Sequence, residues 1–123
     1  MNHQSAIDST VLHGWNYYWK STHLSELRDD LIDVIAEHAF SCSSPRSYVA
    51  MFHLKGAVSR VAEGGTAFGN RQASHAITLD AVWRPGEDFG DRDTAWSRGF
   101  FAALGRFREG VYVNFLGGDE DPD

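Results

Sequence analysis

The stretch HAITLDAVW, residues 75–83, carries the clearest structural signal in the sequence. One set of alternating positions is apolar: Ile77, Leu79, Ala81 and Trp83. The other set is mixed: Thr78, Asp80 and Val82. Such alternation predicts a β-strand whose two faces meet different surroundings. Pro85-Gly86 then predicts the turn that ends the strand.

Three further segments are predicted before this strand. Aromatic residues crowd residues 15–22 and favour a strand. Ser25, the acidic residues that follow it and an apolar period near 3.6 predict a helix over residues 25–39. Residues 47–61 predict a long strand that bends at Gly56. A glycine-rich turn and a short irregular stretch then lead into residue 75.

The chain after the turn at residue 86 predicts one helix and one strand. Residues 93–107 place Trp96, Phe100 and Phe107 on one helical face, and Gly110 is typical of a helix end. Residues 111–116 favour a last strand. The order β-α-β-β-α-β predicts an α+β, ferredoxin-like sandwich, in which an antiparallel sheet carries both helices on one face. The other face would be open to a ligand or partner.

Composition narrows the class of protein. The 123 residues carry a net charge of −6, which argues against nucleic-acid binding. We expect a flexible lead-in over residues 1–14, one domain over residues 15–117 and an acidic tail over residues 118–123. No signal-peptide pattern or long apolar run is present, so we expect no membrane segment. The single cysteine, Cys42, excludes an internal disulfide, and a cytoplasmic location fits these features.

Several polar residues could carry chemistry. Asp80, with Thr78 beside it, would lie on the open sheet face, where loss of water raises a carboxyl pKa and suits a general acid or base. Tyr18 and Lys20 share one strand face and could polarise a carbonyl together. His53 lies in a predicted central strand. Each has a structural alternative: a solvent-facing aspartate, a ring beneath a lysine stem, and a core histidine.

Metal binding and cysteine chemistry are not expected. The six histidines lack the spacing of metal motifs, and Cys42 follows the first helix without an evident base. Aromatic residues make up 13% of the chain. They either fill the core or partly line a cavity for a flat ligand, and the sequence leaves both interpretations open.

Four segments resemble consecutive pieces of the berberine-bridge-enzyme-like FAD-linked oxidases. They are YYWKS (17–21), GAVSRV (56–61), TAFGNR (66–71) and YVNF (112–115), in that family's order and with about its spacing. The resemblance covers nearly the whole chain after residue 12. It implies the second half of a substrate-binding domain, whose open sheet face covers the flavin and frames the substrate in family members.

The resemblance also implies departures from the family's chemistry. Nothing corresponds to the FAD-binding domain, so we expect no cofactor. The family's base is often the second tyrosine of a Tyr-x-Asn-Tyr strand, and Phe115, which cannot accept a proton, stands there. Phe115 and Tyr112 are then expected to contact substrate, although Tyr112 could also be a packed ring. Arg60 matches an active-site position of the plant enzymes and could bind an anion, or be a surface arginine.

Three functions follow from these features. The first is a stand-alone, flavin-free protein that binds a small molecule and catalyses a non-redox cyclisation, isomerisation or dehydration of a natural-product intermediate, with Asp80, Arg60 and His53 as catalytic residues. The second is a non-catalytic binding or partner subunit that completes a FAD-linked oxidoreductase. The third is a fragment of such an oxidase. Because a large apolar sheet face should be covered, we also expect a homodimer.

Overall fold

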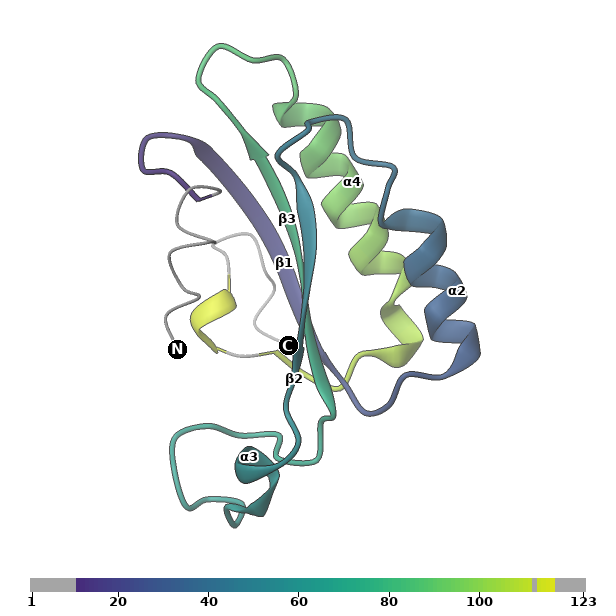
Figure 1. Cartoon of the computed structure of the whole chain (residues 1–123), viewed down its shortest axis with the longest axis vertical. Helices are drawn as coiled ribbons and strands as arrows, with labels where there is room; N and C mark the ends of the chain where they lie inside the picture. Colours follow the sequence, from purple (N-terminus) through teal and green to yellow (C-terminus); the bar gives the residue numbers. More distant parts are fainter. Residues whose placement is uncertain (1–10, 112, 117–123) are drawn as a thin grey trace.

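The computed structural model describes residues 11–111 and 113–116. Strands β1 (Asn16–Leu24), β2 (Tyr48–His53) and β3 (His75–Trp83) form an antiparallel sheet in the order β1-β3-β2. Helices α2 (Asp29–His38) and α4 (Gly90–Ala103) lie on one side of it (Figure 1). This is the predicted α+β, ferredoxin-like arrangement, and the strand at residues 75–83 has the predicted bounds.

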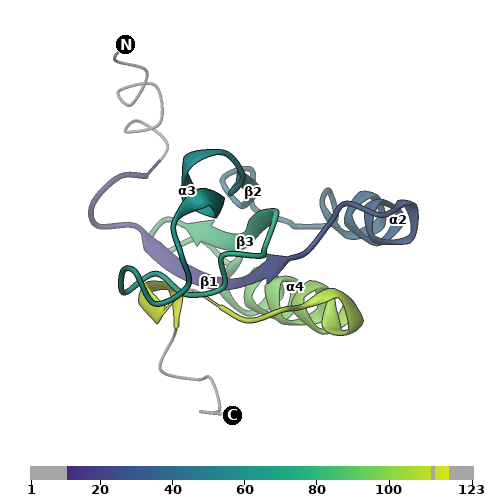
Figure 2. The ribbon, with the colours of Figure 1, turned by 90° about the horizontal axis from the view of Figure 1, so that it is seen from below.

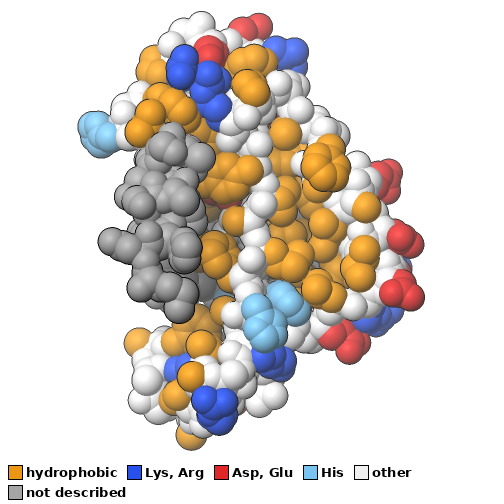
Figure 3. Space-filling view, viewed as in Figure 1, with side chains coloured by type: hydrophobic (Ala, Val, Ile, Leu, Met, Phe, Trp, Pro, Cys, Tyr) orange, Lys and Arg blue, Asp and Glu red, His pale blue; other side chains and the backbone are white. Residues whose placement is uncertain are grey.

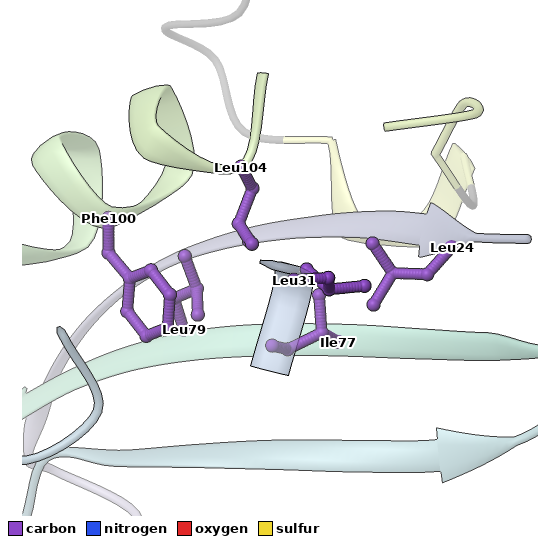
Figure 4. Packing of buried hydrophobic residues seen from close by; sticks show 6 residues of the cluster. All are labelled: Leu24, Leu31, Ile77, Leu79, Phe100 and Leu104. Carbon is purple, nitrogen blue, oxygen red and sulfur yellow. The ribbon is translucent and has the colours of Figure 1, made fainter. Parts of the chain in front are cut away.

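The core lies between the sheet and the helices. Six buried side chains form it: Leu24, Leu31, Ile77, Leu79, Phe100 and Leu104 (Figure 4). Ile77 and Leu79 come from β3, so the apolar half of its alternation faces the helices as predicted. Burial of each such side chain contributes roughly 1.5–3 kcal/mol to folding.

A buried carboxylate fixes the loop between α2 and β2. Asp93 of α4 is fully buried and accepts hydrogen bonds from the backbone N–H groups of Ser43 (2.8 Å) and Ser44 (3.0 Å) and from Ser47 Oγ (2.5 Å). The Ser44 hydroxyl donates to the Val82 carbonyl, and Ser47 Oγ accepts from the Val82 N–H. These bonds hold the start of β2 against the end of β3.

The long strand predicted over residues 47–61 is wrong beyond residue 53. β2 ends at His53, and Gly56 has a φ of 79°, which turns the chain out of the sheet. A short helix, α3 (Ala57–Arg60), follows. It lies beyond the end of β2, away from α2 and α4 (Figures 1 and 2).

The last predicted strand, residues 111–116, is also wrong in its described part. The chain begins to pair with β1, because His23 N–H donates to the Gly110 carbonyl (2.7 Å) and Glu109 N–H donates to the His23 carbonyl (3.0 Å). Gly110 then has a φ of 121°, which redirects the backbone. Val113–Phe115 form a 3₁₀ turn, η2, in place of a fourth strand.

The helix bounds shift by several residues. α2 begins at Asp29 rather than near Ser25, and Arg28 precedes it without a side-chain cap. α4 begins at Gly90 and ends at Ala103, followed by a separate 3₁₀ turn, η1 (Gly105–Phe107). In the part of the chain that the structure describes, no helix has the length and apolar character to cross a membrane. Most of the expected lead-in and the whole tail lie outside the described residues.

Candidate functional site

The candidate site is the sheet face opposite α2 and α4. The register places Asp80 directly between Trp19 of β1 and Tyr48 of β2. Directly opposed residues share a face, so one carboxylate lies between two aromatic side chains. All three are partly buried. The centre of the site therefore comes from the face of β3 that carries Thr78, Asp80 and Val82.

The local environment changes how Asp80 and Tyr48 bind protons. Burial raises the pKa of Asp80, and a hydrogen bond from Thr78 Oγ1 (2.6 Å) partly offsets that rise. Burial, followed by the charge of Asp80 and the neighbouring Tyr17, raises the pKa of Tyr48 to about 12. At neutral pH, Asp80 is thus a stronger proton acceptor than an ordinary aspartate, and Tyr48 keeps its phenolic proton.

The turn η2 borders this face. Trp19 Nε1 donates a hydrogen bond to the Phe115 carbonyl (3.0 Å), which brings residues 96 positions apart together. η2 consequently lies on the opposite side of the sheet from α2 and α4 (Figure 1). Phe115 was predicted to contact substrate, and this bond places its backbone next to Trp19, which lies beside Asp80. Tyr112, predicted for the same role, lies outside the described residues.

The structure does not bring the three predicted catalytic residues together. His53 is opposite His75, five residues along β3 from Asp80, or roughly 17 Å at about 3.3 Å per residue. It also points to the other face, since His75 has the parity of Ile77. Arg60 lies exposed on α3, beyond that same end of β2.

Tyr18 and Lys20 lie on the helix-facing side of β1. Lys20 pairs with Leu79, is buried, and holds its Nζ 5.8 Å from the ring centroids of both Tyr18 and Phe101. Arg98 of α4 donates from Nε to Tyr18 Oη (2.9 Å). This pair therefore contacts α4 and is separated from Asp80 by the sheet.

Two residues of the site were missed by reasoning from sequence. Tyr48 has no motif of its own and Trp19 stood out only as part of YYWKS (17–21), and only the pairing register places the two beside Asp80. The sequence showed that both are aromatic and lie in predicted strands. It did not show which side chains of neighbouring strands share a face, because that depends on the pairing register.

Other possible sites offer less. The described residues contain no group of three or more metal-binding side chains. Burial, and then the charge of Asp93, raises the pKa of Cys42, which disfavours a reactive thiolate. A hollow of about 260 Å³ lies between the start of α2 and η1, with Arg28, Arg106 and Arg108 in its wall. It contains none of the predicted site residues.

Comparison with known proteins identifies the fold. The structure resembles GilR. GilR is an oxidoreductase that catalyses the terminal step of gilvocarcin biosynthesis, and its matching structure is a complex with pregilvocarcin. The match has a TM-score of 0.70 and 21% sequence identity and covers 86% of this chain. The chain spans 24% of the length of GilR. No family model and no curated protein sequence matches the chain. Because the sequence identity is only 21%, the likeness to GilR shows a shared fold.

Proposed function

We propose that the sheet face around Asp80 binds a planar, hydroxylated natural-product intermediate and catalyses a non-redox step on it. The observation that carries this proposal is the partly buried carboxylate between Trp19 and Tyr48. The sequence resemblance to a substrate-binding domain supports it. So does the fold shared with GilR, an oxidoreductase of gilvocarcin biosynthesis.

The chemistry follows from the three side chains. Trp19 and Tyr48 offer ring surface for a flat ligand. Asp80 accepts a proton from a substrate carbon beside a carbonyl, and the same proton returns to another substrate atom. Tyr48, which stays protonated, donates a hydrogen bond to the oxygen that gains charge. Such an isomerisation balances without an oxidant. In a dehydration, Asp80 returns the proton to the substrate hydroxyl that leaves as water. In a cyclisation, it returns the proton to the substrate oxygen that gains charge as the ring bond forms.

The N-termini of α2 and α4 do not fit a flavin diphosphate. Helix N-termini are the usual place for such a group. Here α2 begins with Asp29 and Asp30, and the first turn of α4 contains Asp91 and Asp93, so negative charge opposes a phosphate at both ends. The proposed proton transfer uses side chains of this chain alone.

The test compares Asp80→Asn with Asp33→Asn, which removes an exposed carboxylate from the outer surface of α2. Pregilvocarcin and planar phenols serve as probes, with binding followed by calorimetry, isomeric products by liquid chromatography and dehydrated products by mass spectrometry. Asp80→Asn should keep binding within about threefold and lose about 10²–10⁴-fold in turnover. Asp33→Asn should match the parent protein. Equal turnover by Asp80→Asn, or binding of every probe without conversion by the parent, would overturn the catalytic role.

A second function is favoured by a different observation, the 24% of GilR that the chain spans. A partner chain carrying a flavin could supply the remainder, and the Asp80 face would then frame the substrate of a redox reaction. Purification from the native host distinguishes the two functions. Flavin absorbance that co-purifies with the chain supports the partner subunit, whereas a colourless protein that converts a probe alone supports the first function.

A further inference from the structure

The outer edge of β2 is unpaired among the described residues. Leu54 N–H donates to the Ser74 carbonyl (2.8 Å), so the even-numbered residues of this register make the hydrogen bonds to β3. Val49 and Met51 consequently direct their backbone N–H and C=O groups away from the sheet. β2 is an edge strand of the three-stranded sheet (Figures 1 and 2).

This edge lacks the features that usually protect an exposed strand. The sequence of β2, YVAMFH, has no proline and no lysine, arginine or acidic residue. Two of its own side chains are exposed, Phe52 by 49% and Met51 by 40%, as are Ile32 of α2 by 46% and Phe40, between α2 and β2, by 90%. Figure 3 shows apolar side chains gathered between β2 and α2. We call the β2 edge with Ile32, Phe40, Met51 and Phe52 the β2 surface.

We propose that the β2 surface binds a second copy of this chain, so that two sheets join through antiparallel pairing of β2 with β2. Because the free backbone groups belong to odd-numbered residues, Val49 must pair with an odd-numbered residue of the partner. A two-fold axis at Ala50 pairs Val49 with Met51 of the partner subunit. The small Ala50 then meets its own copy at the axis, where opposed residues approach most closely.

Side-chain complementarity favours this register. Directly opposed residues share a face, so Val49 and Met51 of both copies extend the apolar surface beside α2. On the opposite face, Phe52 lies beside Tyr48 of the partner subunit, an aromatic cross-strand pair. An axis at Met51 would instead place Phe52 beside the partner's Ala50 and lose that contact.

The self-complementary pairing of β2 and its exposed apolar area point to a second copy as the occupant, and the placement of charge allows it. Two copies of a chain with net charge −6 repel each other, but the strand that would meet is uncharged. The acidic residues Asp33 and Glu37 belong to the exposed part of α2, and Figure 3 shows acidic side chains at the margin away from β2. At roughly 200 Å² per large side chain, the four residues expose about 450 Å² of apolar surface, of which about 180 Å² belongs to Met51 and Phe52 of β2 itself. A standard interface uses about 450 Å² of apolar surface per partner.

The first experiment introduces charge at the edge. Met51→Lys places on the strand a charge of the kind that protects edge strands from pairing. Val61→Lys is the matched control, since Val61 is 38% exposed in the loop after α3. Sedimentation velocity at micromolar concentrations should show dimers for the parent and Val61→Lys, and at least 30-fold weaker association for Met51→Lys. Unfolding curves check that all three proteins are folded. A monomeric parent, including one that pairs only with a flavoprotein, or a dimeric Met51→Lys would overturn the proposal.

The second experiment tests the register. In a Cys42→Ser background, Ala50→Cys should form a covalent dimer on mild oxidation, because the Cα atoms of a non-hydrogen-bonded pair lie about 4.5 Å apart, within disulfide range. Lys55→Cys, five positions from the proposed axis, should stay monomeric in reducing-agent-free gels. Cross-linking of Lys55→Cys but not of Ala50→Cys would show that the copies associate elsewhere.

Discussion

Replacing Asp93 with alanine should cost a large part of the stability of the protein. The carboxylate is fully buried and accepts three hydrogen bonds, from Ser43 N–H, Ser44 N–H and Ser47 Oγ. Asp93→Ala leaves these three donors without their acceptor in a place that water reaches poorly. The same change loosens the joint between α4 and the start of β2.

The magnitude follows from the bonds removed. A hydrogen bond to a charged group contributes about 1.5–3 kcal/mol, and the three share one acceptor, so their losses are not additive. We expect a decrease of about 3–5 kcal/mol in the free energy of unfolding. Domains of this kind have about 5–15 kcal/mol in total. The melting temperature should therefore fall by about 10–20 °C.

Urea denaturation followed by far-ultraviolet circular dichroism measures this effect. Asp91→Ala is the control, because Asp91 is exposed in the same first turn of α4 and contributes about 0.3–1 kcal/mol through the helix dipole. An Asp93→Ala protein within 1 kcal/mol of Asp91→Ala would refute the idea that this carboxylate fixes the loop.

Three further predictions concern helix packing and pH. Gly90→Ala should destabilise the fold by about 1–3 kcal/mol, since the added Cβ would lie 3.0 Å from the Trp83 ring. Gly99→Ala should stabilise the fold by about 0.5–1 kcal/mol, since its added Cβ meets nothing within 4 Å. Chemical denaturation compares the free energies of unfolding of the two variants. The pKa of Asp80 is raised on folding, so ionised Asp80 destabilises the folded chain at neutral pH. Asp80→Asn should therefore be more stable than the parent there, and this gain should disappear as the pH falls to below 3.8, the ordinary value. Burial lowers the pKa of His23, so the parent should lose stability as the pH falls below 6.5, and His23→Gln should lose less between neutral pH and pH 5.

The sequence alone determined the strand at residues 75–83, the order of the three strands and the two longer helices, and the apolar face that forms the core. These features depend on local alternation and helical period, which neighbouring residues along the chain set among themselves. The pattern at residues 54–61 misled because alternating apolar residues do not reveal the positive φ of Gly56. Residues 111–116 misled for the same reason at Gly110.

The candidate site depends on the tertiary structure to a greater extent. Asp80 was predicted on the open face from its own strand, but its neighbours Trp19 and Tyr48 come from two other strands. Their meeting is set by the register, and a shift of one residue would turn each ring to the helix side. Arg60 is separated from Asp80 because β2 ends before it, and His53 because it lies five residues along the sheet and on the other face. Local sequence indicated which side chains a strand could present, and long-range backbone pairing decided which of them share a face.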